Sequence, residues 1–68
     1  MDKIGILIAQ LNDPNEGVRL AIIKVLGKIG SARAEEALIA QLSDNSADVR
    51  REAVEALGNI GNEVQDED

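Results

Sequence analysis

The chain repeats itself at an offset of 31 residues. Aligning residues 7–33 with residues 38–64 gives 27 pairs, of which 12 are identical. The identical stretches are LIAQL at 7–11 and 38–42, VR at 18–19 and 49–50, and most of LGKIG at 26–30 against LGNIG at 57–61. A period of 20–50 residues is typical of stacked supersecondary units, none of which buries its apolar side chains alone. The repeat therefore limits the fold to a short array of similar units.

Each unit is predicted to be a helical hairpin. In the first unit, a helix with the i, i+3, i+4, i+7 spacing carries Ile4, Leu7, Ile8 and Leu11. The polar turn at 12–15 ends it, and a second helix covers about 16–29. The apolar stripe of that helix comprises Val18, Ile22, Val25, Leu26 and Ile29, with Ile23 at its edge. The second unit predicts helices at about 33–42 and 47–60 around a turn at 43–46.

These four helices predict a single all-α domain over residues 1–68. Its parts are a first repeat at 1–31, a second repeat at 32–62 and an acidic tail at 63–68. Three short connections leave no room for a sheet. A chain of this size buries only about 60% of its unfolded surface, so we expect a marginal core.

The composition excludes several classes of function. The chain contains no Cys, His, Phe, Tyr or Trp, which removes the usual zinc ligands, thiol and imidazole catalysts and aromatic platforms for bases. Its net charge of −6 argues against binding to nucleic acid or to an anionic membrane. No run approaches the roughly 20 apolar residues of a membrane-spanning helix. We expect a soluble cytoplasmic protein that is not an enzyme and has no metal or other cofactor.

The repeated glycines could belong to a phosphate-binding loop. The stretch at 27–30, Gly-Lys-Ile-Gly, lacks the spacing of a Walker loop, and the RNA-clamping GXXG loop belongs to folds that contain a sheet. The periodicity favours structural roles. Gly27 and Gly58 are predicted inside helices that neighbours approach closely, and Gly30 and Gly61 just past helix ends, where the chain turns.

An aspartate and an arginine recur around each predicted turn. Asp13 and Asp44 precede the second helix of their units, where a carboxylate can accept backbone N–H groups. Arg19 and Arg50 lie one turn inside that helix and could pair with the aspartate of the same unit or of the next. A catalytic carboxylate is the alternative interpretation, which the lack of a nearby nucleophile, histidine or metal cluster disfavours.

The second half, EEALIAQLSDNSADVRREAVEALGNIG, resembles a HEAT-like repeat of the type named after phycobilisome lyases. The features that carry the resemblance are LI-x-x-L, an Asp, V-R and A-L-G-x-I-G, and residues 4–62 keep this frame. The resemblance implies a right-handed α–α superhelix fragment, an Asp–Arg ladder between adjacent repeats, and protein binding on a concave face. Similar proteins include iron-dependent hydroxylases with His–Glu ligands, but no histidine matches them here.

One arc of the two second helices is predicted to face away from the core and to bind a partner. The arc also holds Gly17, Ala47 and Asp48, and the residues predicted to bind are Glu16, Leu20, Ala21, Lys24, Lys28, Arg51, Glu52, Glu55 and Asn59. Leu20 is the large apolar residue of the arc and the candidate hot spot; the alternative is a scattered surface leucine.

Large aliphatic residues are unevenly distributed between the units. Residues 4–31 contain twelve Ile, Leu or Val, whereas residues 35–62 contain seven. Either these side chains fill the groove between the units, or the first unit packs against another molecule. We favour self-association, most simply a homodimer through repeat 1. A two-fold dimer would close the surface, whereas head-to-tail stacking of residues 1–34, with a net charge of +2, on residues 35–68, with a net charge of −8, would tend to grow filaments. The sequence thus predicts a non-catalytic protein-binding scaffold; the alternative is an accessory subunit or fragment of a larger lyase-like repeat assembly.

Overall fold

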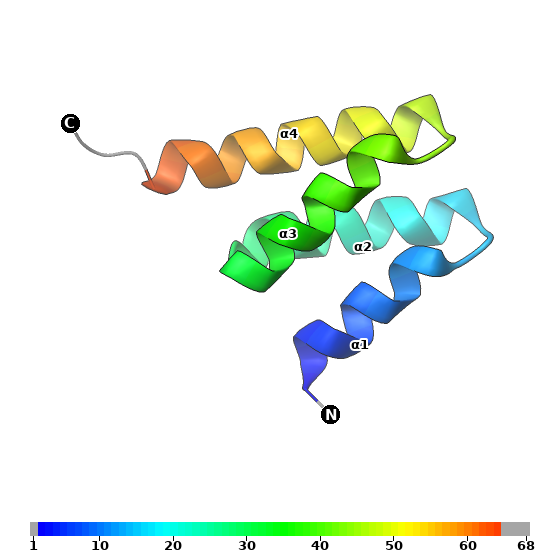
Figure 1. Ribbon diagram of the computed structural model, residues 1–68, viewed down its shortest axis with the longest axis horizontal. Helices are drawn as coiled ribbons and strands as arrows, with labels where there is room; N and C mark the ends of the chain where they lie inside the picture. The colour runs from blue at the N-terminus through cyan, green and yellow to red at the C-terminus, as the bar shows by residue number, and fades with distance from the viewer. Residues whose placement is uncertain (1, 65–68) are drawn as a thin grey trace.

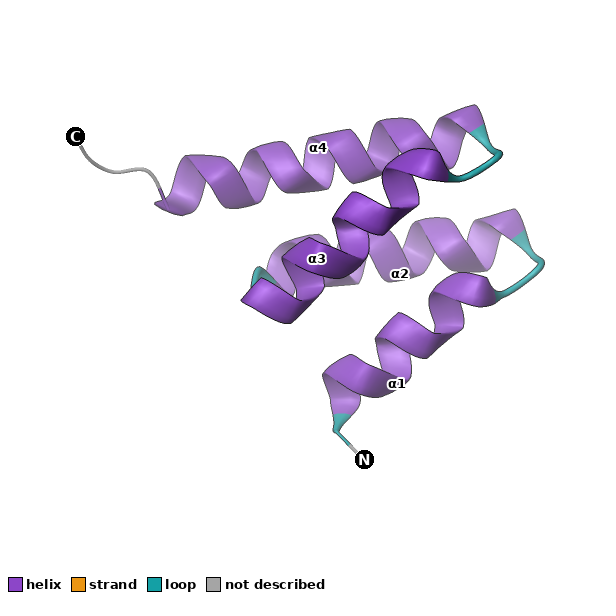
Figure 2. Cartoon of the chain, in the orientation of Figure 1, coloured by secondary structure: helices purple, strands orange, loops and turns teal. Residues whose placement is uncertain are grey.

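The chain folds into two helical hairpins stacked side by side (Figure 1). The computed structural model describes residues 2–64, with side chains described through residue 61. The first hairpin contains α1 (Lys3–Ala9), which ends in the 3-10 turn η1 (Gln10–Asn12), and α2 (Glu16–Ile29). The second contains α3 (Ala32–Ala40), which ends in η2 (Gln41–Ser43), and α4 (Ala47–Val64). Residues 2–64 contain no strand (Figure 2), so the all-α fold expected from the sequence is confirmed.

The four helices form two layers. In Figure 1, α1 and α3 lie next to each other in one layer, and α2 and α4 run alongside each other in the other layer. The turn between α1 and α2 and the turn between α3 and α4 lie at the same edge of the molecule. This arrangement places equivalent parts of the two repeats in register, so a residue of one repeat can reach its counterpart in the other.

Every helix begins with a side chain that accepts a hydrogen bond from a backbone N–H of its first turn. Asp2 accepts from Gly5 at 2.6 Å and Asn15 from Val18 at 3.1 Å. The two serine hydroxyls do the same: Ser31 accepts from Ala34 at 3.2 Å, and Ser46 from Val49 at 3.3 Å. These residues satisfy N–H groups that have no partner inside the helix, and thus fix where each helix begins.

The core consists of aliphatic side chains and alanines from both repeats. Ile23, Leu26, Leu38 and Val49 are fully buried, and the remaining buried residues are Leu11, Ala34, Ala53, Ala56 and Ile60. The sequence placed Ile23 at the edge of the apolar stripe of α2 and Val25 and Ile29 within it. This assignment was wrong, because Ile23 has no exposed surface whereas Val25 and Ile29 are 42% and 36% exposed. The stacked second repeat covers the Ile23 side of the helix.

The two helix ends predicted at glycines differ. Gly30 follows α2 in the left-handed conformation, with φ of 67°, and its N–H bonds to the Leu26 carbonyl at 3.0 Å. Helix α4 instead continues through Gly61 to Val64, so the prediction that the chain turns at Gly61 was wrong. Ser31 caps the next helix directly after Gly30, and no described helix follows Gly61 to draw the chain back. Most of the acidic tail predicted at 63–68 lies outside the described residues.

The two helix-internal glycines have different surroundings. A Cβ added to Gly27 would lie 2.9 Å from the Ala56 Cβ, and one added to Gly58 would meet nothing within 4 Å. Gly27 therefore lets α2 and α4 approach closely. We expect Gly27→Ala to destabilise the protein by about 1 kcal/mol, because overpacking of about 2 kcal/mol exceeds the gain in helix propensity.

The matched control is Gly58→Ala, which we expect to stabilise the protein by about 0.5–1 kcal/mol through helix propensity alone. Thermal unfolding followed by circular dichroism should therefore place the two midpoints on opposite sides of the wild type. A rise in midpoint for both variants would show that the α2–α4 contact has room for a methyl group.

Candidate protein-binding surface

A groove runs between α2 and α4, and no residue of α1 or α3 lines it. Its volume is about 610 Å³, and its lining residues are Lys24, Gly27 and Lys28 of α2 and Glu52, Glu55, Ala56 and Asn59 of α4. The close approach at Gly27 and Ala56 gives the groove a floor of small residues. Longer side chains spaced one helical turn apart form the two walls. The shape suits side chains that enter from a partner segment lying along the groove.

The two walls carry opposite charge. Lys24 and Lys28 are exposed on the α2 wall, and Glu52 and Glu55 face them from α4. Among the side chains of residues 2–61, the ion pairs are Arg19–Asp44, Arg33–Asp2 and Arg51–Asp48, and none involves these four groove residues. These four charges therefore have no ion-pair partner among the described side chains and can contact groups on another molecule.

The structure brings together five of the nine residues predicted to bind a partner. Lys24, Lys28, Glu52, Glu55 and Asn59 line the groove, whereas the other four lie outside it. Leu20, the predicted hot spot, is half-buried and packs against the core, which disfavours it as an exposed anchor. Ala21 is exposed but lines no part of the groove, and Arg51 pairs with Asp48 at 2.9 Å. Glu16 accepts a hydrogen bond from the Ser46 hydroxyl of the next repeat.

The sequence predicts the close helix approach at Gly27 but not that Ala56 lies opposite it in the floor of the groove. Ala56 lies on the apolar stripe of its helix, so the helical wheel predicts that it is buried. A wheel of one helix cannot show that the edge of this stripe borders a groove formed with a second helix. The sequence did contain a signal for this contact. Gly27 lies inside the second helix of repeat 1, and repeat 2 has the small residue Ala56 at the position where repeat 1 has Val25. Together these small residues indicate a close helix–helix contact.

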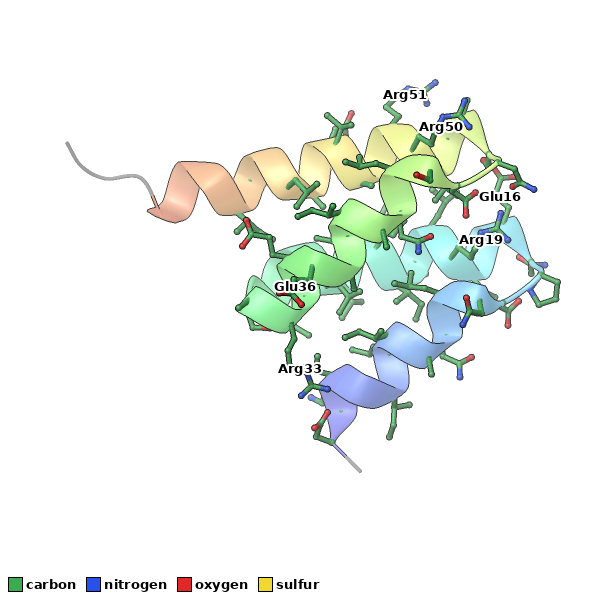
Figure 3. All side chains as sticks on the ribbon, in the orientation of Figure 1. Glu16, Arg19, Arg33, Glu36, Arg50 and Arg51 are labelled. Atoms are coloured by element: carbon green, nitrogen blue, oxygen red, sulfur yellow. The ribbon has the colours of Figure 1, made fainter. Side chains whose placement is uncertain are left out.

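A polar ladder connects the two turns at the edge of the molecule. Arg19 lies at the start of α2 and points toward the second turn (Figure 3), where its Nη2 donates to Asp44 Oδ2 at 3.2 Å. Its Nε lies 3.0 Å from Asp44 Oδ1, in an ion-pair contact without hydrogen-bond alignment. Both side chains are nearly buried, at 12% and 11% exposure. The sequence left open whether Arg19 pairs with the aspartate of its own repeat or with that of the next repeat. It pairs with Asp44 of the next repeat.

The same arginine is anchored to its own turn. Arg19 Nη1 donates to the Asp13 carbonyl at 2.8 Å, and Arg50 Nη1 donates to the Asp44 carbonyl at 2.6 Å. Each aspartate carboxylate also accepts a backbone N–H within its turn, at 2.8 Å for Asp13 and 2.9 Å for Asp44. The two turns are therefore built alike, and each holds its arginine in the same way.

A second contact between the repeats lies at the opposite end of the first helices. Arg33 of α3 reaches toward the start of α1 (Figure 3) and donates to Asp2 Oδ2 at 3.0 Å. The Arg33 guanidinium, together with the backbone N–H of Gly5, holds the pKa of the Asp2 carboxyl below its ordinary value of 3.8. Both side chains are exposed, so solvent screens the pair and its effect on stability is small.

Comparison with known families agrees with this architecture. The family model described as HEAT repeats matches residues 4–67, which is almost the whole chain. The chain belongs to the HEAT repeat family. A search of curated proteins found no match.

HEAT repeats are generally non-catalytic scaffolds for protein interaction. The described residues contain no group of three or more carboxylate, histidine or cysteine side chains arranged to hold a metal ion. No helix within residues 2–64 is long and apolar enough to cross a membrane.

Proposed function

We propose that this protein is a non-catalytic binding module that holds a segment of a partner protein in the groove between α2 and α4. The observation that carries the proposal is the pair of oppositely charged walls, none of whose lysines or glutamates forms an ion pair within residues 2–61. Such walls would orient a segment that carries acidic side chains on one side and basic side chains on the other.

The shape and rigidity of the groove also favour a polypeptide partner. Small-molecule sites are enclosed and mostly apolar, with few polar groups. This groove is open, and charged side chains form its walls. Because both walls belong to helices that pack through Gly27 and Ala56, the surface exists before binding, which keeps the ordering cost on this side low.

Reversing the charge of the basic wall should change what the groove binds. We expect peptides selected on the immobilised wild-type protein from a random display library to be enriched in both acidic and basic residues, with the acidic ones contacting the Lys24–Lys28 wall. The double variant Lys24→Glu/Lys28→Glu should bind these peptides roughly tenfold or more weakly, because about 1.4 kcal/mol corresponds to a factor of ten.

The control is Lys3→Glu, an exposed charge reversal on α1 outside the groove, which should bind the same peptides as the wild type. Unchanged binding by the Lys24→Glu/Lys28→Glu variant, with its helical circular dichroism intact, would remove the groove from consideration as the binding site.

Self-association through repeat 1, most simply as a homodimer, is a second proposal. Of the additional aliphatic residues of that repeat, Ile6 and Val25 are 44% and 42% exposed, so they do not fill the space between the repeats. Leu20 and Ile22 are half-buried against the core. The exposed residues support a contact with a further molecule.

An accessory role in a larger HEAT-repeat assembly is the alternative, and assignment to the phycobilisome-lyase type of repeat belongs with it. The residue pattern LI-x-x-L, Asp, V-R and A-L-G-x-I-G supports this assignment. Co-purification of a second repeat protein in fixed stoichiometry would favour this alternative. The cytoplasmic location stays a prediction from the sequence.

A further inference from the structure

The two ends of the repeat stack expose counterparts of the interface that is buried between the repeats. Ile23 is fully buried, and its equivalent 31 positions later, Val54, is 58% exposed. Gly27 touches Ala56, and its equivalent Gly58 has nothing within 4 Å. Equivalent positions of two similar hairpins differ in this way because repeat 2 covers repeat 1 and no described element covers repeat 2. We call this open surface the C-terminal face; its residues are Ile39, Leu42, Val54, Leu57 and Gly58.

The opposite end of the stack shows the complementary surface. Ala56 and Ile60 of repeat 2 are 7% and 5% exposed against repeat 1, whereas their equivalents Val25 and Ile29 are 42% and 36% exposed. We call this surface the N-terminal face; its residues are the exposed Val25 and Ile29 and the half-buried Leu7, Val18 and Ile22, and the equivalents of all five in repeat 2 are buried. The C-terminal face thus has residues equivalent to the repeat 1 side of the interface between the repeats, and the N-terminal face has residues equivalent to its repeat 2 side.

The turn ladder also has one unmatched group at each end. Arg50 is anchored on the Asp44 carbonyl as Arg19 is anchored on the Asp13 carbonyl. Arg19 spans to the carboxylate of the next repeat, but among the side chains of residues 2–61 Arg50 has no carboxylate partner. Among the same side chains of residues 2–61, the Asp13 carboxylate has no arginine partner. A cation next to the C-terminal face and an anion next to the N-terminal face thus repeat the spacing of the internal ion pair.

We propose that the C-terminal face of one copy stacks on the N-terminal face of a second copy, with Arg50 of the first pairing with Asp13 of the second. This proposal specifies how the chain associates with itself and does not depend on the groove. The overall charge supports this polarity, since residues 1–34 carry five basic and three acidic groups, a net +2, and residues 35–68 carry two basic and ten acidic groups, a net −8. Stacking end to end places the positive half against the negative half.

A two-fold dimer through repeat 1 matches these features less well. In a two-fold contact, each copy contributes the same patch, so each N-terminal face would bring Asp13 and neither would bring Arg50. The C-terminal face, with its exposed Val54, would also stay open. A head-to-tail contact uses both faces and both unmatched charges, and it can extend beyond two copies.

The new contact is expected to keep the register of the internal one with a wider spacing. Ile22 and Val25 replace Ala53 and Ala56 on one side, and Val54 replaces Ile23 on the other. The larger side chains on the N-terminal face separate α4 of one copy from α2 of the next. We therefore expect a reversible association that depends on concentration.

Blocking the two faces separately tests the proposal. Val54→Glu places a charge on the C-terminal face, and Val25→Glu places one on the N-terminal face; both positions are exposed, so the fold should persist and circular dichroism verifies it. By light scattering, the wild type should grow in mass with concentration, and each variant alone should stay at the monomer mass of 7.2 kDa. An equimolar mixture should form particles of twice that mass and no larger, because each variant retains the face that the other needs.

Other outcomes would overturn the proposal. If Val54→Glu remains dimeric, Val25→Glu is monomeric and mixing produces nothing new, the contact is the two-fold one through repeat 1. A wild type that stays at 7.2 kDa at all concentrations excludes both modes. The groove variant Lys24→Glu/Lys28→Glu changes no residue of either face, so it should still grow in mass with concentration, but more weakly than the wild type because residues 1–34 then carry a net charge of −2. The loss of peptide binding in this variant tests the groove separately.

Charge exchange tests the ladder contact itself. Arg50→Asp and Asp13→Arg should each reduce association, because each sets like charges against each other at the contact. A mixture of the two should restore growth, since every contact between unlike variants then joins opposite charges. Failure of the mixture to exceed its components, with both variants folded, would exclude the ion pair from the contact.

Discussion

Ile23→Ala is expected to unfold most of the protein at 25 °C. Ile23 is fully buried in the cluster formed by both repeats, and truncation of a buried isoleucine to alanine costs about 2–5 kcal/mol. A single core in a chain shorter than about 70 residues rarely supplies more than about 3–5 kcal/mol. The loss is therefore comparable to the total free energy of unfolding, and the helical circular dichroism should largely disappear.

The matched control is Val54→Ala at the equivalent position of repeat 2. Val54 is 58% exposed, so its truncation should change the free energy of unfolding by no more than about 0.5 kcal/mol. Urea titrations followed by circular dichroism at 222 nm, at low micromolar protein, compare the two while suppressing association. Similar losses for both variants would mean that the repeats do not stack as described.

The repeat pattern was sufficient to predict the helices, because the same apolar spacing appeared twice and a polar turn separated the two helices of each unit. It could not identify Ile23 as the centre of the core. Ile22 and Ile23 are neighbours on α2, and the periodicity of one helix cannot tell which of two adjacent stripes the next repeat will cover. The structure resolves this by packing α4 along the Ile23 side, which leaves Val25 exposed.

The residues of the groove walls could be predicted from the sequence because they are charged. Lys24, Lys28, Glu52 and Glu55 are charged residues at helical spacing, and charge excludes them from the core whatever the packing. Leu20 carried no such constraint, and it packs against the core at intermediate exposure. Positions at which polarity decides the environment were therefore predictable, and positions at which tertiary packing decides it were not.

Arg19→Met is expected to destabilise the protein by about 2 kcal/mol. The change keeps most of the side-chain volume but removes the ion pair with Asp44, in which both partners are nearly buried, and the hydrogen bond to the Asp13 carbonyl. Removing one partner of a fully buried pair costs about 3–5 kcal/mol, and partial access of water to Asp44 reduces that value. A loss of this size should lower the thermal midpoint by roughly 8–16 °C in a domain of this size.

The equivalent substitution in repeat 2, Arg50→Met, removes a hydrogen bond to the Asp44 carbonyl but no ion pair within residues 2–61. We expect it to cost about 0.5 kcal/mol under dilute conditions. Midpoints lowered equally by Arg19→Met and Arg50→Met would contradict the assignment of the cross-repeat pair as a stabilising contact.

A double-mutant cycle isolates the contact from the individual side chains. Asp44→Asn keeps an oxygen for the Ser46 N–H but removes the charge, so the Arg19–Asp44 cycle should give a coupling energy of about 1–2 kcal/mol. The Arg50–Asp44 cycle should give a value near zero, because Arg50 bonds the backbone carbonyl of Asp44 and not its carboxylate. Arg19 and Arg50 occupy equivalent positions, and these results would show that such an arginine forms a stabilising ion pair only where a following repeat supplies the aspartate. This difference is the reason to expect that Arg50 acts between copies and Arg19 within one.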